Sequence, residues 1–112
     1  MKITNLKNLP IQQVSHNPEI VKKVMLDSQD IPHLTNFSQA TFAPGQIASA
    51  HSHPDMFEVF FVSAGIGIMR IENKEYNLTP GVCIAIATGE THEVINTGTD
   101  NLVLTYFGIV DG

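Results

Sequence analysis

The chain has 112 residues, which suffice for one domain around a single hydrophobic core but not for two. Its 43% hydrophobic and 15% charged residues exclude a disordered protein, and its net charge of −5 excludes a basic surface for nucleic acid or an anionic membrane. Neither a signal peptide nor a membrane-spanning stretch is recognisable, so we expect a cytoplasmic protein.

The N-terminal segment differs from the rest of the chain. Ile3, Leu6 and Leu9 share one face of a potential helix, but Pro10 and Pro18 limit that helix to a turn or two. We therefore expect residues 1–20 to form an arm that covers a single β domain of residues 21–112.

Short runs rich in β-branched and aromatic residues recur after this segment, and turn residues separate them. The predicted strands are residues 21–26, 33–43, 56–62, 65–71, 81–87, 92–96 and 101–110. Strands this short and evenly spaced are typical of a β-sandwich or a small β-barrel. The sequence therefore predicts an all-β fold.

The apolar runs also contain the single cysteine and most of the aromatic residues. Cys83 cannot form a disulfide within the chain, and its apolar neighbours predict a packed thiol without chemistry of its own. We expect the aromatic side chains to belong to the core, or to the wall of a pocket if they line the barrel. They are Phe42, Phe57, Phe60, Phe61, Tyr106 and Phe107.

Three histidines and one glutamate form the most specific pattern in the sequence. His51 and His53 are two residues apart, a spacing that places both side chains on one face of a strand. Glu58 lies among large apolar residues, so it either points outward or needs a partner inside. His92 opens a later strand and reaches the other two only if the sheet curls back, as a barrel does. Such a set of nitrogen and oxygen donors suits Fe, Mn, Ni, Cu or Zn.

The first part of this pattern spans residues 45–65. Gly45, His51, His53, Glu58 and Gly65 occupy every defined position of the pattern G-x5-H-x-H-x4-E-x6-G. This stretch resembles the first motif of the cupins.

Residues 81–96 resemble the second cupin motif, G-x5-P-x-G-x2-H-x3-N. Gly81, Gly89, His92 and Asn96 match it, whereas Ala87 stands where the motif has proline. An alanine there loosens the bend before His92 but removes no donor atom. We expect the motif glycines and Asn96 to have structural roles, in tight turns and a turn-side hydrogen bond.

The resemblance implies a small single-domain cupin, whose fold is a jelly-roll or double-stranded β-helix barrel. It implies that His51, His53, Glu58 and His92 bind one divalent transition metal ion per chain, and that two positions of an octahedral ion stay open. It also implies that Glu58 can leave the metal and act as a catalytic base. The remaining histidines, His16 and His33, are expected to be surface or packing residues rather than ligands.

Three functions fit these residues. The first is a metal-dependent enzyme, with a dioxygenase-like oxidoreductase favoured, that acts on a small oxygen-bearing organic molecule chelated at the metal. The second is a non-catalytic cupin module or sensor that binds a small ligand or a sugar. The third is a metal-dependent isomerase or lyase, because cupins share their ligands but not their chemistry. We also expect a homodimer with residues 1–14 near the interface, since edge strands need cover.

Overall fold

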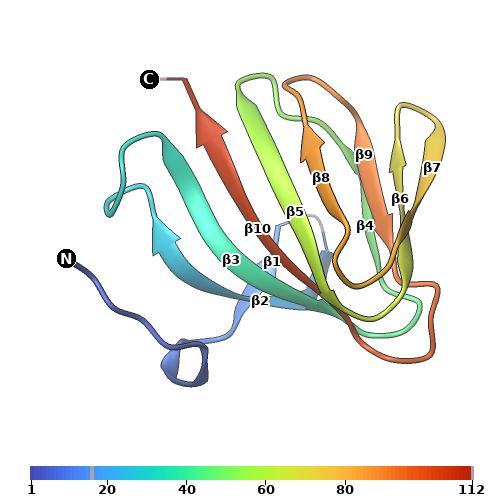
Figure 1. Ribbon diagram of the computed structural model, residues 1–112, viewed down its shortest axis with the longest axis horizontal. Helices are drawn as coiled ribbons and strands as arrows, with labels where there is room; N and C mark the ends of the chain where they lie inside the picture. Colours follow the sequence, from blue (N-terminus) through green and yellow to red (C-terminus); the bar gives the residue numbers. More distant parts are fainter. Residues whose placement is uncertain (16, 112) are drawn as a thin grey trace.

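A computed structural model describes residues 1–15 and 17–111 as two antiparallel β-sheets that pack against each other (Figure 1). The larger sheet has six strands, in the order β1-β2-β3-β10-β5-β8. In that order the strands are β1 (Gln12–Val14), β2 (Asn17–Asp27), β3 (Leu34–Phe42), β10 (Leu102–Val110), β5 (Met56–Ala64) and β8 (Cys83–Ile86). This sheet supplies one wall of the interior.

The second sheet has four strands, in the order β4-β9-β6-β7. They are β4 (Ile47–His51), β9 (His92–Ile95), β6 (Gly67–Ile71) and β7 (Lys74–Leu78). Alternate residues of both sheets point inward, so that Leu104 on β10 and Met69 on β6 are almost completely buried in one core. The predicted all-β jelly-roll class is confirmed.

All seven predicted strands are present, and three further strands were not predicted as apolar runs. β1 has only three residues, and four of the five residues of β7 are exposed. β4 consists largely of small residues, so its hydrophobic signal is weak. These three strands pair through backbone hydrogen bonds with neighbours that carry stronger patterns.

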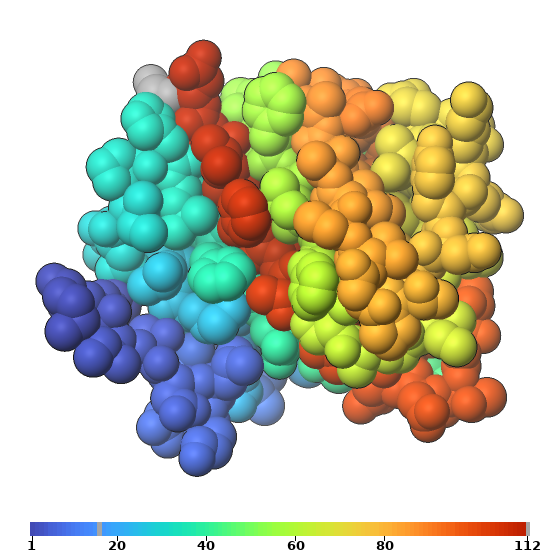
Figure 2. Space-filling model, viewed as in Figure 1, coloured from blue at the N-terminus to red at the C-terminus, as the bar shows by residue number. Residues whose placement is uncertain are grey.

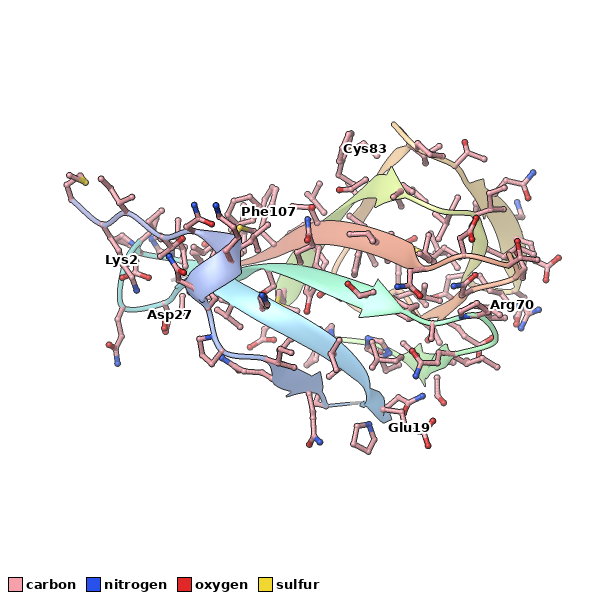
Figure 3. All side chains as sticks on the ribbon, turned by 90° about the horizontal axis from the view of Figure 1, so that it is seen from below. Lys2, Glu19, Asp27, Arg70, Cys83 and Phe107 are labelled. Atoms are coloured by element: carbon pink, nitrogen blue, oxygen red, sulfur yellow. The ribbon has the colours of Figure 1, made fainter. Side chains whose placement is uncertain are left out.

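The N-terminal segment lies along one edge of the larger sheet. It contains the 3-10 turn η1 (Leu6–Asn8), whose Leu6 carbonyl accepts a hydrogen bond from Lys23 Nζ at 2.7 Å. Lys2 forms an ion pair with Asp30 at 3.0 Å, and Figure 3 shows Lys2 beside the end of β2 that carries Asp27. The division into an arm and a domain at residue 20 stays a prediction, and β1 and the start of β2 pair within the larger sheet.

Two predictions about burial are wrong. Cys83 is exposed, because it points outward from β8 while Ile84 and Ile86 point inward. Phe57 and Phe61 are 53% and 45% exposed, since Glu58 and Phe60 take the inward positions of β5. Figure 3 places Cys83 on the outer side of the larger sheet. Among the described residues, no helix is long and apolar enough to cross a membrane.

Candidate metal centre

The four side chains singled out in the sequence come together between the two sheets. Two of the histidines belong to the smaller sheet, His51 at the end of β4 and His92 at the start of β9, and His53 lies in the loop that follows β4. Glu58 comes from β5 of the larger sheet and is 7% exposed. One donor atom from each of the four lies within 4.8 Å of the others. The site therefore bridges the two layers of the fold.

Antiparallel pairing brings the most distant histidine to the site. His51 and His92 are direct partners in the register between β4 and β9, and their ring centroids are 4.2 Å apart. The irregularity in this register between Ala48 and His51 shifts the end of β4 relative to β9. The approach of His92 thus needs no closed barrel, only the pairing of two neighbouring strands.

Backbone carbonyls orient two of the imidazoles. His51 Nδ1 lies 2.7 Å from the Ser49 carbonyl and His92 Nδ1 lies 3.1 Å from the Glu90 carbonyl. A carbonyl oxygen only accepts, so each Nδ1 carries the proton and each Nε2 carries the lone pair. This is the second-sphere arrangement that metal-binding histidines commonly have.

The loop that carries His92 is fixed by main-chain hydrogen bonds. The Gly89 N–H donates to the His53 carbonyl at 2.8 Å, which joins the two histidine segments directly. The Ala87 N–H donates to the Glu90 carboxylate at 2.8 Å. Proline has no N–H and could not make that bond. In this chain the bend before His92 is therefore fixed by the Ala87 hydrogen bond instead of by a proline ring.

Two buried polar atoms in the cluster lack hydrogen-bond partners. Glu58 Oε1 and His92 Nε2 are buried atoms for which the described residues offer no properly oriented hydrogen bond, although they are 3.1 Å apart. Glu58 Oε1 is also 3.4 Å from His53 Nε2. Leaving such atoms unsatisfied costs about 1–3 kcal/mol each. A cation between them would satisfy both.

The donor set fits a divalent transition metal ion. Metal–ligand bonds of about 2.1 Å separate adjacent donors by roughly 3 Å, which is close to the distances from Glu58 Oε1 to His53 and His92. Imidazole nitrogens suit Fe, Mn, Ni, Cu and Zn better than Mg or Ca, which prefer oxygen. The predicted residues thus form a candidate metal site whose ion the geometry does not single out.

His92 is held in a charged environment. Burial disfavours its protonation, but the Glu58 carboxylate and the Glu90 carbonyl outweigh burial and raise the pKa of His92 above its usual value. The same groups would also favour a metal cation at this nitrogen.

A cavity of about 140 Å³ opens onto the cluster and is lined by all four side chains. Phe60 packs between Tyr106 and His92 in its wall, with ring centroids 5.2 Å and 6.1 Å away. Burial and the nearby Glu58 charge raise the pKa of Tyr106 to about 12, against an opposing hydrogen bond from Ser38. Tyr106 therefore stays protonated at neutral pH. Tyr106 thus lies in the wall of the cavity, one of the two positions expected of the aromatic side chains.

The other predicted positions lie away from the cluster. Asn96 is 2% exposed, donates to the carbonyls of Phe42 and Asp100, and accepts from the Gly98 N–H, which confirms its structural role. His33 is exposed, which is one of the two positions expected of it, and His16 lies outside the described residues.

A family model described as the cupin domain matches residues 38–108, which is more than half of the chain. The chain belongs to the cupin family. Both motifs that suggested this resemblance lie inside the matched region. The membership accounts for the two-layered fold, and the candidate metal site draws its residues from both motifs.

One curated protein is similar to part of the chain in sequence. An oxalate-binding protein of Thermotoga maritima is 27% identical over 66 residues, which are 59% of this cupin and 54% of that protein. The chain thus matches about half the length of this curated relative.

Two solved structures share the fold at lower identity. A predicted oxalate decarboxylase from Thermotoga maritima has a TM-score of 0.91 at 18% identity, with 98% of this chain and 100% of that chain covered. KdgF from a Halomonas species has a TM-score of 0.82 at 20% identity, with 99% and 96% covered. These likenesses establish the fold and leave the reaction open.

Proposed function

We propose that this cupin binds one divalent transition metal ion through His51, His53, Glu58 and His92 and acts there on a small oxygen-bearing organic molecule. The observation that carries the proposal is the buried pair Glu58 Oε1 and His92 Nε2, which lacks a hydrogen bond and faces a cavity. A bound divalent ion would supply Lewis-acid polarisation of a substrate oxygen. Fe, Mn, Ni, Cu and Zn all remain candidates.

Oxidoreductase chemistry of the dioxygenase type is the reaction that we favour, and it requires one of the redox-active ions in that set. An isomerase or lyase would need only Lewis-acid chemistry. The chain's own contribution is the same in both cases: Glu58 takes up a proton and the apolar cavity wall limits water.

A non-catalytic binding module is the second candidate. Its specific support is the Thermotoga maritima relative, which is named for binding oxalate. The two candidates differ in whether a small acid bound by the metal-loaded protein is consumed. A screen of oxalate and of small hydroxy- and keto-acids, followed by product analysis and oxygen consumption, separates them.

The variant Glu58→Gln is expected to lose turnover by about 100- to 10,000-fold if Glu58 is the base, because the amide cannot take up a proton. Its three histidine neighbours remain, so the variant keeps its fold and a weakened metal site. Turnover is measured at a saturating concentration of the metal, with metal content determined on the same sample.

The control is Glu75→Gln, the same chemical change at an exposed residue of β7 that pairs with Arg70. It should match the wild type in metal content and turnover. A metal-loaded Glu58→Gln variant with wild-type turnover would contradict the catalytic role of Glu58, whatever the metal.

We further propose a homodimer formed through the outer face of the larger sheet, with residues 1–14 near the interface. Figure 2 shows this face, formed by β3, β10, β5 and β8. Phe57 and Ile109 are direct cross-strand neighbours on it and are 53% and 45% exposed. Half-exposed apolar side chains grouped in this way are typical of an interface.

The variant Phe61→Asp is expected to convert the dimer to a monomer, because it places a charge in the apolar face. Light scattering at micromolar concentration should then give about 12.3 kDa in place of twice that mass. Tyr76→Asp is the matched control, since Tyr76 is also 45% exposed but lies on β7 of the other sheet. A monomeric wild type would refute the dimer.

A further inference from the structure

Lys22 occupies an inward position on β2, far in sequence from both cupin motifs. It lies two residues after Ile20, which is completely buried, so the alternation of the strand directs both side chains to the same face. In the register Lys22 pairs with Ala40, which is 2% exposed and also faces inward. The lysine is half-buried and lies on the face of β2 that is directed toward the interior.

The cavity at the metal centre reaches this lysine. Lys22 lines the same space of about 140 Å³ as His51, His53, Glu58 and His92. Most of the remaining wall is apolar, with Ser15, Asn36 and Tyr106 as the further polar residues. One small cavity therefore holds a candidate metal site and a lysine side chain.

Three other cations have partners that lie outside this cavity. Lys2 pairs with Asp30, Lys23 donates to the Leu6 carbonyl, and Arg70 pairs with two glutamates. Within residues 1–15 and 17–111, Lys22 is the Lys or Arg residue that lines this cavity. A positive charge beside apolar side chains is poorly solvated, so a bound anion would stabilise it.

The net charge of the metal-loaded cavity indicates how much negative charge this anion should carry. With neutral imidazoles, a divalent ion, the Glu58 carboxylate and the Lys22 ammonium sum to two positive charges. Tyr106 is protonated and adds none. Glu90 is half-buried and its charge acts on His92, but within residues 1–15 and 17–111 no Asp or Glu other than Glu58 lines the cavity. Two carboxylates would balance the cavity.

We infer that Lys22 binds the distal carboxylate of a small dicarboxylate whose other carboxylate lies at the metal centre. The inference rests on the proposed function and deepens it, because it names the ligand class and a residue that selects it. The cavity is smaller than the pockets of roughly 300–1,000 Å³ that bind drug-sized ligands. The dicarboxylate should therefore have few carbon atoms. Lys22 is a specificity-determining residue in this arrangement, and the metal binds without it.

The test compares diacids with monoacids of equal carbon number. Isothermal titration calorimetry on the manganese-loaded protein measures binding of malonate against propionate and of succinate against butyrate, while elemental analysis gives the metal content of each sample. The wild type should prefer the diacid of at least one pair. Lys22→Met should keep its metal and bind that diacid about 10- to 100-fold more weakly. This is the usual contribution of a hydrogen bond to a charged group. Its affinity for the monoacid should stay within about twofold.

Two further variants serve as controls. Lys22→Arg keeps the charge and should retain most of the preference for the diacid. Lys74→Met makes the same change in net charge at an exposed residue of β7 and should behave as the wild type.

The possible failures are distinguishable. Equal affinity of the wild type and Lys22→Met for the diacid would overturn the inference alone, as would a metal-loaded wild type that binds no diacid more tightly than its monoacid. A wild type that takes up no metal would overturn the proposed function and the inference with it.

Discussion

The double variant His51→Ala/His53→Ala is expected to retain less than about a tenth of the metal found in the wild type. Changing groups that only orient ligands already costs about 10- to 100-fold in metal affinity, so loss of two of four ligands should cost more. Elemental analysis of protein purified without chelator or nickel resin measures this, and the wild type should carry close to one ion per chain.

Thermal unfolding provides a second measurement of the same loss. An ion present at about 1,000 times its Kd stabilises the folded state by about 4 kcal/mol, which corresponds to roughly 10–20 °C for a domain of this size. Adding a chelator should therefore lower the Tm of the wild type by this amount. It should leave the Tm of the double variant unchanged, because that protein holds no ion to lose.

His33→Asn is the control for this experiment, since His33 is exposed and lies outside the cluster. Asparagine tolerates the positive φ of 71° at that position. The control should bind metal as the wild type does. Equal metal contents in the wild type and the double variant would place the ion elsewhere, and a zinc-loaded wild type would favour the isomerase or lyase over the dioxygenase.

Gly65→Ala is expected to lower the free energy of unfolding by about 3 kcal/mol or more. Gly65 has a φ of +88°, and a Cβ there would lie 2.7 Å from Leu102 Cα and closer still to the Asn101 carbonyl oxygen. Both are backbone atoms, so relief requires β5 and β10 to separate at their ends, where Leu102 is fully buried. Urea denaturation measures the effect.

The variant Gly81→Ala measures the effect of backbone strain without a steric clash. Gly81 has a φ of +95°, but no atom lies within 4 Å of an added Cβ. The free energy of unfolding of this variant should therefore fall by only about 1 kcal/mol, the cost of a left-handed conformation for alanine. Equal losses in the two variants would mean that close packing of β5 against β10 is not what selects glycine at position 65.

The strands that the sequence predicted are those with strong apolar patterns, and the missed strands show why such patterns fail. β7 pairs with β6 along its whole length, yet four of its five residues are exposed. Hydrophobic periodicity reports burial rather than backbone pairing, so an exposed edge strand leaves no signal. The prediction for Cys83 failed for a related reason, because the run at residues 81–87 is apolar on both faces and does not reveal which face points inward.

The amino-acid sequence by itself determined the all-β class, the cupin motifs and the four candidate ligands, because residue type and spacing carry that information locally. Only the tertiary structure decided that Glu58 reaches the histidines from the opposite sheet and that His51 pairs with His92. It also brought Lys22 and Tyr106 to the same cavity. These contacts join residues far apart in the chain, and strand order and register, which depend on the packing of the whole sheet, determine them.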